Sequence, residues 1–306
     1  MRDAFSNALV RLAEQDPKLL LLTGDHGYAL FDEFRSRAPG QYINAGIAEQ
    51  NMVGMAAGLA RLGFRPFVYG LSAFVPVRVL EQIKLDIAHD DLPVVLLGDG
   101  AGFVYSHLGT SHQSTEDIAC TRALPGLTIL SPADAHEMTA CMDLAYACRR
   151  PVYMRMGKSD RGAVHDAALP PLQTGGLLQL CAGAPGGLVL LATGSMVRTA
   201  LDVVQQGLPD AAVWSVPSIK PLDADAVIAA TAATAGVVVL EEHSTLGGLG
   251  SAIAELLGER RPTPILRIGV EDRFSQHCGT YAYLLREHGL DTETVTARIQ
   301  RFAAAL

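Results

Sequence analysis

Residues 42–63, YINAGIAEQNMVGMAAGLARLG, constrain the fold of this chain more than any other stretch. Apolar side chains recur there at helical spacing and alanines fill the positions between them, which predicts a helix buried on most faces. Gly54 and Gly58 lie four residues apart, so they share a face of this helix and let another backbone approach closely. Gly63 suits the left-handed residue that ends many helices.

One acidic side chain, Glu49, lies in the first turn of this apolar helix. The helix dipole favours a negative charge at that place, whereas burial favours the neutral form of a carboxyl group. A carboxyl group under both influences suits acid–base chemistry. The alternative, a glutamate that only supports the start of the helix, stays open on the helix alone.

Apolar segments of strand length alternate with segments of helical periodicity along the whole chain. In the first half, strands are predicted at 18–23, 41–44, 65–69, 93–97, 127–130 and 151–156, with helices that include 72–89 and 114–123. In the second half, strands are predicted at 188–192, 212–216, 236–240 and 264–268. Such alternation predicts an α/β fold of two doubly wound domains with mainly parallel sheets.

A stretch with few long apolar runs separates the two halves. It contains Pro170 and Pro171 in sequence and two Gly-Gly pairs, which are typical of loops. We therefore predict a first domain over residues 1–160, a linker over 161–186 and a second domain over 187–306. Each predicted domain is long enough to bury a core of its own.

Charge and composition argue against several classes of protein. The net charge of −8 argues against nucleic acid as a partner. No apolar run is long enough to cross a bilayer, and the acidic, helical start of the chain does not resemble a signal peptide. The five cysteines form no CxxC pair and are typical of reduced thiols. A cytoplasmic protein is expected.

The central stretch also carries a family resemblance. GIAEQNMVGMAAGLA resembles the pyrimidine-binding domain of the transketolase family, which uses thiamine diphosphate. In that family the matching glutamate bonds N1′ of the cofactor's aminopyrimidine ring, and the resemblance carries this catalytic and cofactor-binding role to Glu49. VVVLEEHSTLGGLGSAIAELL and RIGVEDRFSQHCGT resemble the family's C-terminal domain. The resemblance therefore covers two of the family's three domains.

The same resemblance implies further cofactor-binding and catalytic residues. Phe74, in YGLSAFVPVR, falls where the family stacks an aromatic ring on the aminopyrimidine. GTSHQ resembles a family loop whose histidine contacts the substrate oxygen and assists proton transfer, a role that falls to His112. Asp25 follows a buried strand and falls beside the cofactor, although it could equally cap a helix.

Substrate-binding residues follow from the resemblance as well. Lys158, in PVYMRMGKSD, and Arg2 fall where the family has bases that bind a sugar phosphate, although either could be a solvated charge. His107 is expected to line the entrance of the site. Leu108 replaces an aspartate that binds a hydroxyl group of the acceptor, and Gly100 replaces a histidine. These two changes predict an acceptor that is less hydroxylated, differently substituted, or bulkier and able to use the space at Gly100.

The metal site is expected on a different chain. Gly98-Asp99-Gly100 looks like the start of this cofactor class's metal motif, but the motif needs an asparagine further along, and Asn7, Asn44 and Asn51 all lie upstream. No metal ligand is therefore predicted here. The family domain that holds the diphosphate and Mg²⁺ has no counterpart in this sequence. We expect an N-terminal transketolase subunit to supply it, in an α2β2 complex.

Taken together, the resemblance implies a subunit of a split transketolase-type enzyme that transfers a two-carbon ketol unit from a ketose, or its phosphate, to an aldehyde. Alternatives are the β subunit of a 2-oxoacid dehydrogenase, a deoxyxylulose-phosphate-synthase-like enzyme and a non-catalytic scaffold subunit. The loop with His112 and the sequence GIAEQNMVGMAAGLA favour transketolase over the dehydrogenase. The joint presence of Glu49, Phe74 and His112 argues against a scaffold.

Overall fold

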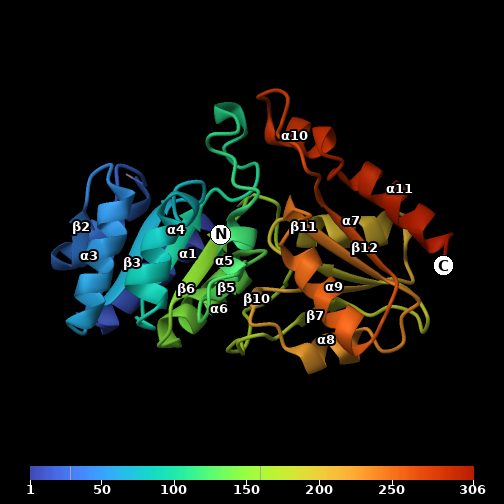
Figure 1. The fold of residues 1–306 in the computed structure, drawn as a ribbon, viewed down its shortest axis with the longest axis horizontal. Coiled ribbons are helices and arrows are strands. Elements are labelled where there is room, and N and C mark those ends of the chain that lie inside the picture. Colours follow the sequence, from blue (N-terminus) through green and yellow to red (C-terminus); the bar gives the residue numbers. More distant parts are fainter. Residues whose placement is uncertain (28, 159) are drawn as a thin grey trace.

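Two sheets organise the computed structural model, which describes residues 1–27, 29–158 and 160–306 (Figure 1). The strands of the first sheet are β1 (Leu19–Thr23), β2 (Tyr42–Asn44), β3 (Arg65–Leu71), β4 (Val95–Asp99), β5 (Thr128–Leu130), β6 (Val152–Met156) and β10 (Ser218–Lys220). The strands of the second are β7 (Leu178–Cys181), β8 (Val189–Ala192), β9 (Ala212–Ser215), β11 (Val237–Ser244) and β12 (Ile265–Val270).

Most neighbouring strands run parallel. The first sheet has the order β10-β5-β6-β4-β3-β1-β2, and the second has the order β12-β11-β8-β9-β7. Only the pairs β10–β5 and β7–β9 are antiparallel among the described strands. Alternate residues of β1 enter different cores, Leu20 and Leu22 on one face of the sheet and Leu19 and Leu21 on the other. Both faces of the sheet are thus covered, and the predicted α/β class is confirmed.

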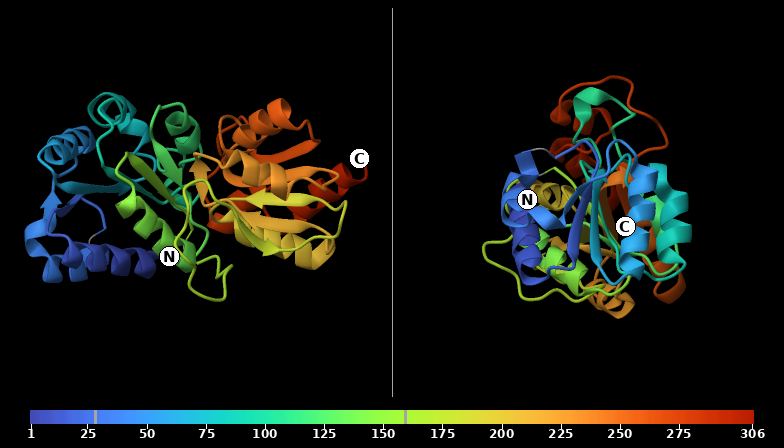
Figure 2. Two further views of the ribbon diagram at one scale, coloured as in Figure 1. Left: turned by 90° about the horizontal axis from the view of Figure 1, so that it is seen from below. Right: turned by 90° about the vertical axis from the view of Figure 1, so that its left-hand side faces the viewer.

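Helices pack on both sheets (Figure 2). Those of the first half are α1 (Arg2–Gln15), α2 (Asp32–Arg37), α3 (Glu49–Arg61), α4 (Leu80–Gln82), α5 (Asp117–Arg122) and α6 (Ala135–Ala147). Those of the second half are α7 (Met196–Gly207), α8 (Ala224–Ala230), α9 (Leu249–Arg260), α10 (Tyr281–Glu287) and α11 (Thr292–Ala303). No described helix has the length and apolar character that a membrane span requires.

Two predicted helices begin later than expected. The helix predicted over 72–89 starts only at the 3-10 turn η3 (Val77–Val79) and continues through α4 into the π-helix η4 (Ile83–Ala88). Pro76 explains the delay, because proline has no N–H group and disfavours helical backbone in the residue before it. The helix predicted over 114–123 starts at Asp117, because the backbone of Ser114 is paired with that of Gly102.

The second half of the chain is less separate than predicted. Strand β7 lies inside the range 161–186 that was predicted as a linker, and it forms an edge of the second sheet. Strand β10 lies inside the range 187–306, yet it pairs with β5 of the first sheet. Both strands are short and only partly apolar, so their patterns are weak signals in the sequence. The domain bounds themselves remain predictions.

Buried polar groups join the two halves. Arg155 Nε donates to Asp117 Oδ2 at 2.8 Å and Arg155 Nη2 donates to the carbonyl oxygen of Glu242 at 2.7 Å. The Glu242 carboxylate accepts a hydrogen bond from the Phe103 amide at 2.6 Å and also from the Tyr281 hydroxyl. Polar backbone groups of each half thus bind a charged side chain that is buried in the other half, and these hydrogen bonds fix how the two halves pack together.

Candidate active site

Glu49 occupies the first position of α3, in the crossover between β2 and β3. Gly46, with φ of 73°, turns the chain into this helix, and its amide donates to the Asn44 side chain at 2.8 Å. Glu49 is only 4% exposed. Arg78 Nη1 donates to Oε2 at 3.1 Å, whereas Oε1 is buried without a hydrogen-bond partner among the described residues. One carboxylate oxygen is therefore positioned and the other is left for a ligand.

His26 lies opposite this free oxygen. Its Nε2 atom is 4.0 Å from Glu49 Oε1 and likewise has no hydrogen-bond partner within the described ranges. The residue follows Asp25 in the loop at the carboxyl end of β1, where ligand-binding residues of parallel sheets gather. The sequence interpretation selected Asp25 and missed His26. The position of this loop was the signal that could have identified it.

Phe74 and His112 complete the group. The Phe74 ring centroid is 5.4 Å from that of His112, edge-on at 65°, and 6.3 Å from that of His26. The guanidinium carbon of Arg78 lies 3.9 Å from the centroid of the Phe74 ring. We call Glu49, His26, Phe74, Arg78 and His112 the Glu49 cluster. Three of its members were predicted from sequence, and the fold brings them together.

The second half of the chain supports the loop that carries His112. The Ser275 hydroxyl donates to Gln113 Oε1 at 2.8 Å and contacts His288 Nε2 at 2.9 Å. The Phe103 ring stacks on that of His288 at 4.8 Å. Burial lowers the pKa of His288, which keeps this support neutral. Figure 1 shows the green loop before α5 beside the red chain before α10.

Arg2 and Lys158 line one cavity of about 320 Å³, although they lie at opposite ends of the first half of the sequence. Asp99 and Tyr105 line it as well. Lys158 Nζ is 3.1 Å from Asp160 Oδ1. The two bases that were predicted to bind an acidic group of the substrate are thus placed where one ligand can reach both.

The other predicted residues lie outside the Glu49 cluster. Asp25, His107 and Leu108 are exposed, and Leu108 keeps 54% of its accessible surface. The space at Gly100 is not open, because a Cβ atom there would lie 1.9 Å from the ring of Tyr105. The expectation that a bulkier substrate uses this space is therefore wrong. Tyr105 fills it because Gly100, with φ of 77°, has no side chain.

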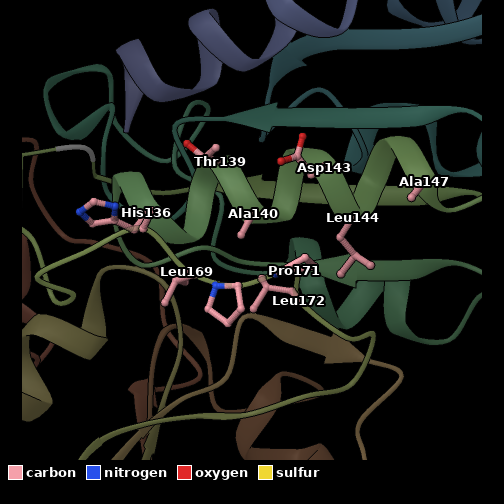
Figure 3. Close-up of a pocket in the computed structure, with 11 residues that line it drawn as sticks. His136, Thr139, Ala140, Asp143, Leu144, Ala147, Leu169, Pro171 and Leu172 are labelled. Carbon is pink, nitrogen blue, oxygen red and sulfur yellow. The ribbon is translucent and has the colours of Figure 1, made fainter.

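A second cavity lies away from this region. About 360 Å³ in volume, it separates α6 from residues 168–172 and is lined by His136, Asp143 and Leu144 among others (Figure 3). No member of the Glu49 cluster lines it. Within the described residues, no group of three or more His, Cys, Asp and Glu side chains is arranged to hold a metal ion.

Comparison with known proteins gives consistent matches. The family model for the transketolase pyrimidine-binding domain matches residues 1–162, and that for the transketolase C-terminal domain matches residues 186–295. The 6-deoxy-6-sulfo-D-fructose transketolase subunit SqwH of Clostridium sp. (strain MSTE9) is 36% identical over 96% of this chain and 92% of its own length. An apulose-4-phosphate transketolase subunit of Phocaeicola vulgatus is 34% identical over 96% of this chain and 94% of its own length.

One solved structure is similar over nearly its whole length. It is a split gene transketolase, described as an inactive beta4 tetramer, and it shares 34% sequence identity with this chain. The TM-score is 0.86, with 98% of this chain and 96% of that chain covered. The likeness therefore extends across both sheets.

Proposed function

This chain belongs to the transketolase family, and from that premise we propose that it is the C-terminal-half subunit of a split, thiamine-diphosphate-dependent transketolase. The complete enzyme would transfer a two-carbon ketol unit from a ketose, or its phosphate, to an aldehyde. One observation carries the proposal for this chain: among the described residues Glu49 Oε1 has no hydrogen-bond partner, although it is buried at the start of an apolar helix, beside His26, Phe74 and His112.

The Glu49 cluster suits a flat heteroaromatic ring with polar nitrogens. Arg78 fixes Oε2 of Glu49, so Oε1 is the atom that can accept a proton or hydrogen bond from a ring nitrogen. His26 Nε2, which has no hydrogen-bond partner within the described ranges, offers a second polar contact. Arg78 covers one face of Phe74, so a flat ring would stack on the other face. When bound, thiamine diphosphate supplies the acidic carbon that attacks a carbonyl group.

His112 would act on the substrate. An imidazole can donate or accept a proton near neutral pH, and the loop carrying His112 holds it beside Phe74. Its Nδ1 is 3.0 Å from the Ser111 hydroxyl, which leaves Nε2 for a substrate oxygen. The contact between Gln113 and Ser275 restrains the loop and so limits the positions that His112 can reach.

The outer face of α3 has the features of a surface that binds a partner subunit. Ile47 is 74% exposed and Leu62 is 76% exposed, although the sequence predicted a helix buried on most faces. Between them a Cβ atom at Gly54 or Gly58 would meet nothing within 4 Å. Exposed apolar ends with small residues between them suit the close approach of another helix. We propose an N-terminal transketolase subunit as the partner, in an α2β2 complex, with the diphosphate and Mg²⁺ held mainly by that partner.

The substrates would be acidic sugars. The two relatives named above are described as acting on a sulfo-sugar and on a sugar phosphate. Arg2 and Lys158 line a cavity that offers positive charge to such an acidic group. Asp25 and His107 would lie at the edge of the cofactor and substrate sites. Leu108 would leave the hydroxyl group next to the acceptor aldehyde without a partner.

Reconstitution tests the proposal. The chain would be mixed with an N-terminal transketolase subunit from the same genome and assayed with hydroxypyruvate as donor and glycolaldehyde as acceptor. We expect activity in the mixture and none in either chain alone. Titration calorimetry of the isolated chain should show no tight binding of thiamine diphosphate and Mg²⁺. Micromolar binding by the isolated chain would contradict the split site.

A further inference from the structure

The cavity that Arg2 and Lys158 share also holds a carboxylate, at Asp99, to which the proposed function gives no role. Asp99 ends β4 and belongs to the Gly-Asp-Gly sequence that looks like a metal motif. In the structure it binds two phenols instead. Asp99 Oδ2 accepts hydrogen bonds from the Tyr69 hydroxyl at 2.8 Å and from the Tyr105 hydroxyl at 2.9 Å.

Both phenols are fixed as donors. Burial raises the pKa of Tyr69 and of Tyr105, and the Asp99 carboxylate raises both further, so the hydroxyls stay protonated near neutral pH. Because both bind Oδ2, the second oxygen of Asp99 has no hydrogen-bond donor among the described residues. The backbone fixes the arrangement further, since the Tyr105 ring fills the space that a side chain at Gly100 would need.

The walls of the cavity therefore carry charges of both signs. Arg2 and Lys158 attract an acidic group, whereas a carboxylate oxygen binds donors and repels anions. A sugar that carries an acidic end and a hydroxyl group close to it satisfies both demands. A purely anionic ligand without such a hydroxyl group does not.

We propose that Asp99 determines substrate specificity by accepting a hydrogen bond, through Oδ1, from a hydroxyl group near the acidic end of the sugar. This inference rests on the proposed function and adds which part of the substrate the chain recognises. A site built to bind a hydroxyl group discriminates strongly against ligands that lack it, because its own polar group is then left unpaired. Asp99 would supply a hydrogen-bond acceptor at the acidic end of the substrate. Leu108 supplies no hydrogen-bond acceptor near the aldehyde.

Kinetics of the reconstituted complex test the assignment. Hydroxypyruvate serves as donor, and glycolaldehyde and ribose 5-phosphate serve as short and long acceptors. Asp99→Asn should lower kcat/KM for ribose 5-phosphate at least tenfold and change that for glycolaldehyde less than twofold. Asp3→Asn, the same change at an exposed residue next to Arg2, should alter neither. Equal effects of Asp99→Asn on both acceptors, or no effect, would overturn the proposal.

A binding measurement separates this proposal from the proposed function. Arg2, Asp99 and Lys158, the residues to which the proposal gives contacts with the sugar, line the cavity in the isolated chain, so the full chain alone should bind ribose 5-phosphate weakly. Saturation-transfer NMR should show signals on the sugar with the wild type, and at least threefold weaker signals with Asp99→Asn. Equal signals, or none with the wild type, would overturn the role of Asp99. A complex inactive with both acceptors would instead contradict the proposed function, and the NMR comparison would still decide on Asp99.

Discussion

The two carboxylate oxygens of Glu49 have different surroundings. Arg78 binds one oxygen, while the other oxygen and His26 Nε2 face each other at 4.0 Å without hydrogen-bonding. Neither atom has a hydrogen-bond partner in the described part of the chain, and two such buried atoms cost stability unless a ligand binds them. A structural glutamate at a helix start would instead bond the backbone amides of its own helix.

Replacing Glu49 tests its chemical role. Glu49→Gln keeps the size of the side chain and removes its capacity to exchange a proton, so kcat of the reconstituted complex should fall about 100-fold or more. The thermal midpoint should stay close to that of the wild type. Glu33→Gln, on the exposed face of α2, serves as the control and should keep full activity. Near-normal turnover in the Glu49 variant would remove this residue from the mechanism.

The sequence revealed the site residues that lie in recognisable motifs, and missed those that only the sheet brings into place. Glu49, Phe74 and His112 each belong to a stretch with a family resemblance. His26 lies outside these stretches, and Arg78, the last residue of YGLSAFVPVR, was not selected as a site residue. They meet Glu49 because β1 pairs with β3 in parallel, so the loops after both strands leave the same edge of the sheet. Such pairing depends on contacts distant in sequence, which local patterns do not encode.

At the scale of elements, α3 is the part of the chain whose sequence and surroundings disagree. Its composition predicts burial on most faces, yet Ile47 just before the helix and Leu62 just after it are exposed, and Cβ atoms at Gly54 and Gly58 between them would meet nothing within 4 Å. The helix lies at the end of the molecule remote from the second sheet (Figure 1). The apolar pattern is what we expect of a helix in an assembly, and it supports the proposal of a further subunit against its outer face.

Filling this face should block assembly without harming the chain. In Gly58→Leu the new Cβ atom meets nothing within 4 Å in the isolated subunit, and leucine favours a helix over glycine by about 0.8 kcal/mol, so the thermal midpoint should hold or rise. Association with the partner, measured by light scattering after gel filtration, should weaken at least tenfold. Gly258→Leu is the matched control, because Gly258 is also an exposed helical glycine with open space around it. Equal association of the two variants would contradict an interface on α3.

Element types were predictable where patterns are long, and failed where they are short or interrupted. The strands β1, β3, β4 and β6 are five to seven residues long and mostly apolar, and each was predicted. The delayed helix after Pro76 and the strand β7 were missed. The late start of the helix depends on how Pro76 restricts the backbone of the residue before it. Strand β7 lies at the edge of its sheet, where only half of a strand's residues need to be apolar.

At the scale of the whole molecule, the two halves are joined by groups that must keep a defined protonation state. His243 of β11 lies at this junction, fully buried. Its Nδ1 atom donates to the carbonyl oxygen of Ser244 at 2.8 Å, and its Nε2 accepts from the amide of Ala119 in α5 at 3.2 Å. Only a neutral imidazole can make both bonds, because a protonated Nε2 would face another N–H donor.

Acid should therefore weaken the junction. Burial, the largest cause, lowers the pKa of His243 from 6.5 to about 4, even though the nearby Asp117 acts in the opposite direction. Between these values the unfolded chain binds the proton and the folded chain does not. The contribution is fully present above pH 6.5 and is lost as the pH falls toward 4, by about 3 kcal/mol in all.

Unfolding by urea, measured from pH 7.5 down to pH 4.5 in the wild type and in His243→Gln, checks this prediction. Glutamine can donate and accept at the same place but does not titrate, so the variant should lose less stability on acidification. Titrating groups remote from His243 act in both proteins and cancel in the difference. The nearest titrating neighbour is Glu241, whose carboxylate oxygen lies 3.7 Å from His243 Nδ1 and whose pKa burial raises to about 7. Its contribution runs the other way, since stability held below pH 4.5 is lost as the pH rises through 7. The same acid sensitivity in both proteins would show that His243 is not the group that ties the junction to pH.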